Sequence, residues 1–440
     1  MRANHKTLSF LLLTVFLGAT TVALAQQSNK ENSPYNRFGI GTLSDNNQNN
    51  IRGGGGAATA YSDPFSVNTF NPATYSFLKL TTLDFGIEAR SRNILLNNNA
   101  VKSSTATFSY FYLGVPLKKY AGLTLGYQPI SSMYYNQSDT SLVDGLGNTA
   151  SSFQGSGNLQ YAFIGLSGQY KGFSIGANVG YAFGNRSQAS SLDYVDSVPY
   201  AYIRSAKYIN TASYGGIYWK GGLMYQGDLS KDRYINVGLT ATLSQSLNMK
   251  RDRFDIAATY FQDATTQIVD SAIDTVASVT GEKGSLVMPA EYSFGVHYGK
   301  WAHWDAGVDF KYSDWSKFRN FGLVDSVANN AWRLSAGGEI TPDPANRKNY
   351  MSQVTYRLGV YYGNDYFYMH NTQLNYWGAT IGLGLPLIKE RLSTQYARIN
   401  TALDIGRRGT TQNGLAREFF VKFSVGVSLN DIWFTKRKYD

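Results

Sequence analysis

The sequence contains no cysteine, and among its 440 residues only 10 are proline and four are histidine. The absence of cysteine excludes a disulfide framework, a lipid anchor on a cysteine and any thiolate metal site. Charged residues make up only 16% of the chain, and its net charge is +10. This modest excess does not predict nucleic-acid binding, because nucleic-acid-binding proteins gather lysine and arginine on one face.

Long apolar runs are also missing beyond residue 25. We find no uninterrupted run of about 20 apolar residues there, so no transmembrane helix is predicted in that part. Before it, Arg2 and Lys6 precede an apolar run over 8–17, and Ala23-Leu24-Ala25 precedes Gln26. This is the layout of a cleaved secretory signal. We therefore expect residues 1–25 to be a signal peptide, and a mature chain that enters a membrane only as a β-barrel.

The clearest pattern in the sequence is the stretch GFSIGANVGYAFG over 172–184. Large apolar side chains from Phe173 to Phe183 take alternate positions, and mostly glycine, serine, asparagine and alanine fill the others. A period of two predicts a β-strand. The stretch is about twice the usual strand length, and its second face carries small side chains instead of the charged ones of a solvated sheet. These features predict a strand of a membrane barrel, apolar toward lipid and small or polar toward the lumen.

The same alternation recurs along the chain, and the composition agrees with it. The sequence has 33 Tyr, 24 Phe, 7 Trp and 44 Gly, which suits aromatic girdles around a polar lumen, although a soluble all-β protein could share it. We predict an all-β, transmembrane antiparallel barrel over residues 81–430 with about 14 strands. They lie at about 83–90, 103–116, 121–130, 157–170, 172–185, 212–227, 234–249, in a hairpin over 288–315 that turns near Lys300, and at 330–340, 352–363, 374–386, 397–406 and 417–429.

The connections between these strands alternate between short and long. Outer-membrane barrels have short periplasmic turns and longer extracellular loops. The rule predicts short turns at 117–120, 171 and 228–233, and long polar extracellular loops at 131–156, 186–210 and 250–287. A supposedly short turn over 341–351, with Pro342 and Pro344, departs from the rule. We expect the basic tail, 431–440, to be a solvated terminus in the periplasm.

Residues 26–80 differ from everything after them. They are rich in asparagine, serine and glycine, include four consecutive glycines at 53–56, and show no period of two. Such a segment is either a disordered leader or a plug packed inside the barrel. Aromatic residues recur in it, which a solvated linker would not need (Tyr35, Phe38, Tyr61, Phe65, Phe70, Tyr75 and Phe77). We therefore favour a plug.

Short motifs are spread over the whole chain: SPYNRFGIG at 33–41, a glycine-rich stretch from 52 ending in NPATYS at 71–76, GSGNLQ at 155–160, MPAEYSFGVHY at 288–298, GLGLPL at 382–387 and NDIWFTKRKYD at 430–440. In this order they resemble the FadL-type family of outer-membrane hydrophobe transporters, in its divergent branch with an N-terminal SPYxRFGxG element. The resemblance implies a monomeric 14-stranded barrel with an N-terminal plug and a lateral exit at a kink in the third strand. It places these residues in the plug: Pro34, Tyr35, Arg37, Phe38, Gly39, Asn71, Pro72 and Ala73.

Pro129 gives one check on that mechanism. It falls at the end of the predicted third strand, where a proline removes a ladder donor and favours a bulge or kink. Pro129 is therefore either the kink of a lateral gate or a plain strand terminator.

Other chemistry finds little support in the sequence. Only His297, His303 and His370 remain beyond the signal, and the first two lie on the predicted inward face with Asp305 and Asp309. A metal site there is conceivable, but such spacing across a hairpin is unspecific. No Gly-x-Ser-x-Gly elbow is present, and the glycines at 53–56 lack the lysine and hydroxyl residue of a phosphate loop. We expect neither an enzyme nor a bound cofactor or metal.

The leading hypothesis is a plugged barrel in the outer membrane of a Gram-negative cell that passes or binds small apolar molecules, such as fatty acids or aromatic hydrocarbons. The alternative is a non-transporting barrel subunit of an outer-membrane complex for protein secretion or barrel assembly. An apolar cavity of about 300–1,000 Å³ between plug and wall would favour transport. A filled lumen would favour the subunit.

Overall fold

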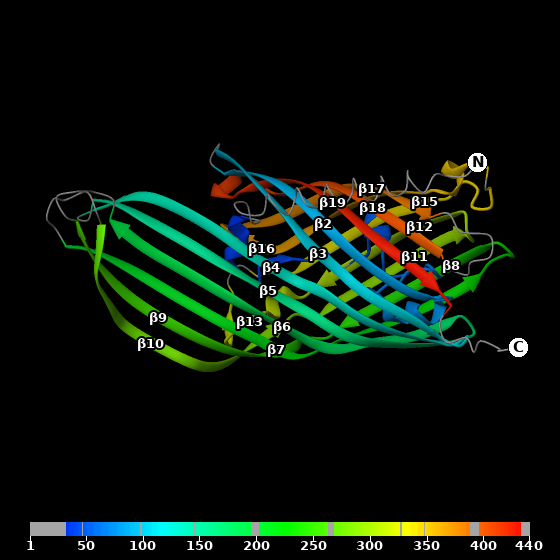
Figure 1. Cartoon of the computed structure of the whole chain (residues 1–440), viewed down its shortest axis with the longest axis horizontal. Helices are drawn as coiled ribbons and strands as arrows, with labels where there is room; N and C mark the ends of the chain where they lie inside the picture. The colour runs from blue at the N-terminus through cyan, green and yellow to red at the C-terminus, as the bar shows by residue number, and fades with distance from the viewer. Residues whose placement is uncertain are drawn as a thin grey trace, which may run out of the picture.

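The computed structural model describes residues 32–45, 47–96, 99–144, 147–194, 202–262, 268–325, 328–346, 348–387 and 396–432. The predicted signal peptide and residues 433–440 of the tail lie outside them. The chain folds into a closed antiparallel barrel of 14 strands (Figure 1), as the sequence predicts. Its strands are β2 (Thr81–Leu96), β3 (Asn99–Leu117), β4 (Ala121–Val143), β5 (Gly147–Tyr170), β6 (Phe173–Tyr194), β7 (Tyr202–Asp228), β8 (Arg233–Thr242), β9 (Gln245–Gln262), β10 (Ile268–Met288), β11 (Glu291–Lys300), β12 (Trp304–Ser313), β15 (Ala331–Ile340), β16 (Thr355–Met369), β17 (Thr372–Leu387), β18 (Tyr396–Gly409) and β19 (Arg417–Asp431).

Two of the barrel strands are each built from two segments. β8 and β9 continue one another across Leu243 and Ser244, and β10 and β11 continue one another across Pro289 and Ala290. The barrel closes where β19 pairs with β2 along its whole length. Smaller elements are β13 (Arg319–Asn320), β14 (Leu323–Val324), η4 (Trp315–Lys317), α3 (Tyr350–Gln353) and η5 (Gln412–Gly414).

The two faces of the wall separate by side-chain type, as the alternation predicts. On β6, Ile175 and Val179 keep 65% and 49% of their surface exposed, whereas Asn178 keeps 2%. Large apolar side chains on the other strands are exposed in the same way, and this outer belt suits contact with lipid. Lys422 points inward, with its Nζ 3.1 Å from Oδ2 of Asp404.

Helices play a small part in this molecule. Within the stretches that the structure describes, none of them has the length and apolarity needed to cross a membrane.

The prediction of three long extracellular loops is wrong. The described residues of 131–156, 186–210 and 250–287 are largely strand. β4 and β5 pair as far as Val143 and Gly147, β6 reaches Tyr194, and β9 and β10 form a paired hairpin. β7 has 27 residues, whereas about 9–11 suffice to cross a bilayer. Beyond the lipid both faces of a strand can be polar, so the sequence there has no period of two. The sheet of β4–β7, β9 and β10 projects past the rest of the barrel (Figure 1), and we call this the long-hairpin end.

The opposite end carries the tight turns. At the turn between β5 and β6, Lys171 and Gly172 have φ angles of 49° and 83°, the values of a two-residue hairpin of the primed type. The predicted turn near Lys300 is also present, between β11 and β12. The long connection over 341–354 includes α3, which agrees with its unusual predicted length.

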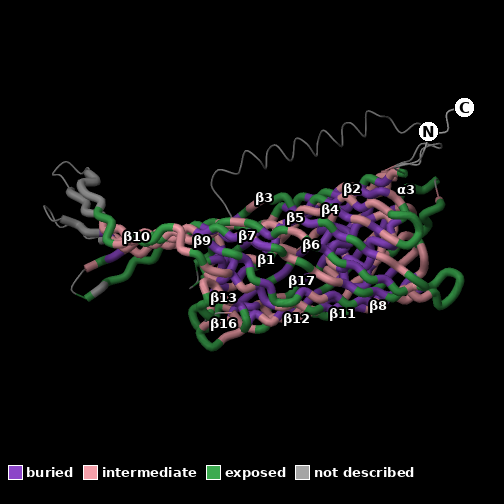
Figure 2. The backbone as a smooth tube through the Cα atoms, turned by 90° about the horizontal axis from the view of Figure 1, so that it is seen from below, coloured by how far each residue is buried: buried purple, intermediate pink, exposed green. Residues whose placement is uncertain are grey.

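Residues 32–45 and 47–80, which we call the N-terminal segment, run inside the barrel (Figure 1). They form η2 (Pro34–Arg37), β1 (Thr42–Leu43), α2 (Asn49–Gly53) and η3 (Pro72–Phe77). Every residue of α2 is buried, against β16–β19, while η3 packs against β3–β7 near the short turns. Buried residues fill the middle of the barrel in Figure 2.

Small inward residues of the wall make room for this segment. A Cβ on Gly176 would lie 2.5 Å from the carbonyl of Pro72, and Cβ atoms on Gly238 and Gly359 would overlap the backbone of Thr59 and Gly55. The inward glycines are therefore required by close approach of a second backbone.

Candidate functional site

The barrel wall splits between β3 and β4. These strands pair only from Leu117–Ala121 to Phe111–Tyr127. Farther toward the long-hairpin end, β3 stays paired with β2 and β4 stays paired with β5, so the two hairpins diverge. The result is a wedge-shaped opening in the ladder that faces the long-hairpin end.

Pro129 lies at the base of this split, two residues beyond Tyr127, the last β4 residue paired with β3. The register of β4 against β5 also shifts between Pro129 and Ser131, so Ile130 is the extra residue of a bulge. Pro129 therefore precedes a bulge, and it does not terminate the strand, because β4 continues to Val143.

The N-terminal segment occupies the split. β1 pairs with β4 through Thr42 opposite Ser132, and the Asn36 side chain donates to the Tyr134 carbonyl at 3.0 Å. Closer to the long-hairpin end, the side-chain amide of Asn32 pairs with β4 as a strand backbone would. Its Nδ2 donates to the Asn136 carbonyl and its Oδ1 accepts from the Asn136 N–H, both at 2.8 Å. The backbone N–H of Asn32 donates to the Ser103 hydroxyl on β3 at 3.0 Å. The segment thus supplies hydrogen-bond partners to the otherwise open edge of β4.

The SPYNRFGIG motif is the part of the segment that lies beside the split. The Ser33 side chain donates to Oε1 of Glu418, a fully buried carboxylate that also pairs with Arg92 at 2.8 Å. The Tyr35 hydroxyl donates to the Ala416 carbonyl at 2.5 Å and accepts from the Ala416 N–H at 3.0 Å. Burial raises the pKa of the Tyr35 phenol, which keeps it neutral and able to donate. Both residues therefore fasten the segment to the start of β19.

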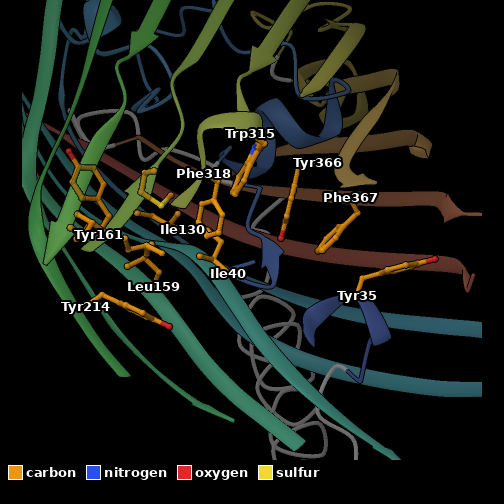
Figure 3. Packing of buried hydrophobic residues seen from close by; sticks show 14 of the residues in the cluster. Tyr35, Ile40, Ile130, Leu159, Tyr161, Tyr214, Trp315, Phe318, Tyr366 and Phe367 are labelled. Carbon is orange, nitrogen blue, oxygen red and sulfur yellow. The ribbon is translucent and has the colours of Figure 1, made fainter. Parts of the chain in front are cut away.

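The rest of the motif has equally local roles. Pro34 begins η2, and the Arg37 guanidinium lies 3.7 Å from the centre of the Phe153 ring on β5. Phe38 packs against the buried aromatic cluster in which Trp315 and Tyr366 stack at 4.1 Å (Figure 3). Gly39 has a φ of 59°, which favours glycine, and its N–H bonds Asp325 at 3.1 Å.

The NPA element lies elsewhere, at η3 near the short turns. The Asn71 side chain accepts from the Ala73 N–H at 3.1 Å and donates to the Leu223 carbonyl of β7 at 3.1 Å. Pro72 is the first residue of η3, and Ser174 of β6 donates to the Ala73 carbonyl at 2.5 Å. The predicted residues therefore fall into two separate groups, one at the split with Pro129 and one at η3.

Ion pairs join the N-terminal segment to the wall along its length. Arg52 lies 2.6 Å from Glu88, Asp63 lies 3.2 Å from Arg398, and Asp45 lies 3.9 Å from Arg333. Burial opposes ionisation of Asp45, but nearby guanidinium groups hold its pKa below the usual value. Removing one partner of a buried pair costs about 3–5 kcal/mol, so these contacts hold the segment in place.

A cavity of about 290 Å³ remains between the segment and the wall. Its lining mixes apolar side chains, such as Ile130 and Trp315, with charged ones, which include Lys220, Glu291 and Lys311 around Phe70. From the sequence, Phe70 was predicted to lie in the plug, whereas Lys220, Glu291 and Lys311 were not identified as site residues. The inward parity of the two lysines on their strands was the available signal.

A larger apolar space, about 1,040 Å³, lies on the outside of the wall. Its lining includes outward side chains such as Leu166, Ile175 and Leu239, which are about half exposed or more. These outward side chains belong to the face of the wall that suits contact with lipid. The cavity between segment and wall, at about 290 Å³ and with a mixed lining, lies just below the apolar pocket of about 300–1,000 Å³ that the transport hypothesis requires.

The histidines take structural positions. His297 is buried and its Nδ1 lies 2.6 Å from Asp305, while Asp309 accepts from the N–H groups of Ala58 and Thr59 at 2.5 Å each. The expectation that His303 lies on the inward face of a strand is wrong. His303 lies in the turn before β12, where its backbone N–H donates to the Lys300 carbonyl at 3.0 Å. Within the residues that the structure describes, no group of three or more potential ligands is arranged to bind a metal.

Comparison with solved structures supports a FadL-like barrel. A Pseudomonas aeruginosa FadL homologue is 14% identical, with a TM-score of 0.55, over 88% of this chain and 98% of that one. The CymD monoaromatic hydrocarbon channel is 14% identical with a TM-score of 0.52, over 90% and 99%. The Ralstonia pickettii toluene transporter TbuX is 13% identical with a TM-score of 0.53, over 87% and 98%. At this identity the likeness establishes the fold alone.

Comparison with curated proteins finds no match. A family model does match, and it covers nearly the whole chain: the model described as BamG aligns with residues 6–440. This chain therefore belongs to the BamG family.

Proposed function

We propose that this protein is a non-transporting barrel subunit of an outer-membrane complex in Gram-negative cells, one that secretes proteins or assembles barrels. The observation that carries the proposal is the filled lumen. The N-terminal segment is held by Arg52–Glu88 and Asp63–Arg398, and the remaining cavity of about 290 Å³ has seven basic side chains in its lining. Such an interior suits a rigid scaffold better than a path for apolar molecules. Membership in the BamG family is compatible with this role.

The projecting sheet at the long-hairpin end offers a surface for partners. β10 pairs with β9 on one side, while on the other side β13 covers only Leu286 and Val287. The described residues provide no further strand along that edge, and open edges accept strands of other chains. Three register shifts in β10 twist this edge and limit uncontrolled pairing.

Affinity purification in mild detergent tests the proposal. The tagged full chain is expected to retain a stoichiometric partner. A variant that joins Arg253 to Val279, which are opposite in the ladder, through Asn-Gly removes the tip of the β9–β10 hairpin and should lose it. Joining Asp139 to Ser151 in the same way shortens the β4–β5 hairpin and serves as the matched control. Recovery of the full chain only as a solitary monomer would contradict the proposal.

A second candidate function rests on the split between β3 and β4. A bulge at Pro129, with only the N-terminal segment filling the opening, is compatible with lateral exit of small apolar molecules such as fatty acids or aromatic hydrocarbons. Uptake of labelled decanoate and toluene by deletion and complemented cells tests this. Equal uptake in both would remove this candidate and leave the first one standing.

A further inference from the structure

Charge is distributed unevenly around the interior cavity. Seven basic side chains line it. Five of them pair with carboxylates other than Glu291: Arg90–Glu88, Arg92–Glu418, Arg333–Asp45, Arg408–Asp365 and Lys422–Asp404. Glu88 also pairs with Arg52, and Glu418 also pairs with Arg408. The other two, Lys220 and Lys311, share a single carboxylate, Glu291. Two ammonium groups therefore share one carboxylate at this place, and Asp309 is a further acidic side chain of the lining.

The geometry around Glu291 is that of an incomplete cluster. The Lys311 Nζ lies 3.2 Å from one carboxylate oxygen, which also accepts from Ser313 at 3.4 Å, and the Lys220 Nζ lies 3.7 Å from the other oxygen. The Lys220 side chain is only 14% exposed. An ammonium group that has left bulk water without a full counter-charge is costly, and each ammonium has three donors to satisfy.

Phe70 of the N-terminal segment completes the place from the other side. The Lys220 and Lys311 ammonium groups lie 3.8 and 5.9 Å from the centre of its ring. The ring face attracts both cations and keeps them near each other, but it accepts no ordinary hydrogen bond. Both lysines line the cavity.

We propose that the cavity binds a compact oxyanion, a carboxylate or phosphate group, between Lys220 and Lys311 above Phe70. Such a group would give the two lysines a second counter-charge and form charge-assisted hydrogen bonds, which are about twice as strong as neutral ones. The volume of about 290 Å³ and the basic side chains of the lining suit a small anionic molecule or an anionic head group. This binding site is independent of the scaffold role and adds a ligand to it.

Calorimetric titration of the purified full chain in detergent tests the site. Inorganic phosphate and succinate represent soluble anions, and decanoate represents an anion carried by lipid. Saturable binding is expected for at least one probe. Changing Lys220→Met together with Lys311→Met should weaken it by at least about tenfold. Glu291→Gln should tighten it several-fold, because the competing carboxylate becomes neutral. Lys283→Met, at an exposed lysine of β10, is the matched control.

The conservative variant Lys311→Arg should retain binding, which keeps the test informative if the double lysine variant does not fold. Binding only by phosphate or succinate assigns a soluble anion, and binding only by decanoate assigns a lipid head group. No saturable binding by any probe would overturn the site. Equal affinity in the folded double variant, or weaker binding in Glu291→Gln, would also overturn it.

Discussion

At the scale of single residues, the backbone of the N-terminal segment lies so close to inward glycines of the wall that any side chain on these glycines would displace it. Gly176 of β6 is the clearest case, because a Cβ there would lie 2.5 Å from the backbone of Pro72. By contrast, a Cβ on Gly221 of β7, which faces outward, would meet nothing closer than 3.9 Å. One glycine is therefore required by packing and the other is not.

Gly176→Leu should lower the free energy of unfolding by about 1–3 kcal/mol, the usual cost of overpacking a dense interior. The physical cause is the fixed position of η3, which Asn71 and Ser174 hold from both sides. Thermal unfolding in detergent measures the effect, with Gly221→Ala as the control that should stay within experimental error. Equal melting of the two variants would show that η3 yields easily.

Tyr35→Phe should loosen the segment at the split. It leaves the Ala416 N–H and carbonyl without their partner, at a cost of about 1–3 kcal/mol. We expect faster tryptic cleavage near Arg37, while the barrel remains folded. Tyr120→Phe, at an exposed tyrosine in the turn before β4, should leave the cleavage rate unchanged. An unaltered rate in Tyr35→Phe would contradict this role of the hydroxyl.

At the scale of elements, strands continue beyond the point where their sequence stops alternating. The part of β6 from Arg186 to Leu192 pairs with β7 residue by residue, although its serines, glutamine and alanine show no apolar face. The ladder hydrogen bonds need no particular side chain, so strand can persist wherever both neighbours persist.

Hydrogen exchange distinguishes such strands from loops. Amides of 186–192, which lie between two neighbouring strands, and those of 274–279 that point toward β9 should exchange far more slowly than those of an unstructured peptide. Mass spectrometry of peptic fragments gives the rates. Exchange at the unstructured rate would restore the loop assignment that the sequence suggested.

The alternation of polarity predicted the barrel and its 14 strands because lipid and lumen impose different demands on the two faces. The same reasoning placed Pro129 at a kink. The length of the hairpins was not predicted, because outside the bilayer both faces of a strand contact water and their side chains need not differ in polarity. It also did not find the cluster of Lys220, Lys311 and Glu291, because these residues come from three strands and converge only when the barrel closes.

At the scale of the whole molecule, the barrel is a wall around a second, irregular body. The interior keeps a cavity of about 290 Å³, while the larger apolar space of about 1,040 Å³ lies outside. Solute flow through the axis therefore depends on whether the N-terminal segment stays in place.

Planar-bilayer recordings measure this directly. The full chain should show no steady ionic conductance, because Arg52 and Asp63 hold the segment across the lumen. A variant lacking residues 32–78 should conduct ions, since the inward side chains of the wall are polar. Refolding of that variant is checked by the heat-dependent shift in gel mobility of a closed barrel. Steady conductance of the full chain would contradict the filled lumen.

The contacts of Ser33 and Tyr35 also constrain the order of events during folding. Their partners, Glu418 and Ala416, lie 385 and 381 positions later in the chain. Ser33 and Tyr35 therefore cannot form these contacts until β19 has been synthesised and has paired with β2. Docking of the segment thus reports that the cylinder is complete, and an unfinished molecule would present an unattached amino-terminal peptide by which it could be distinguished from a finished one.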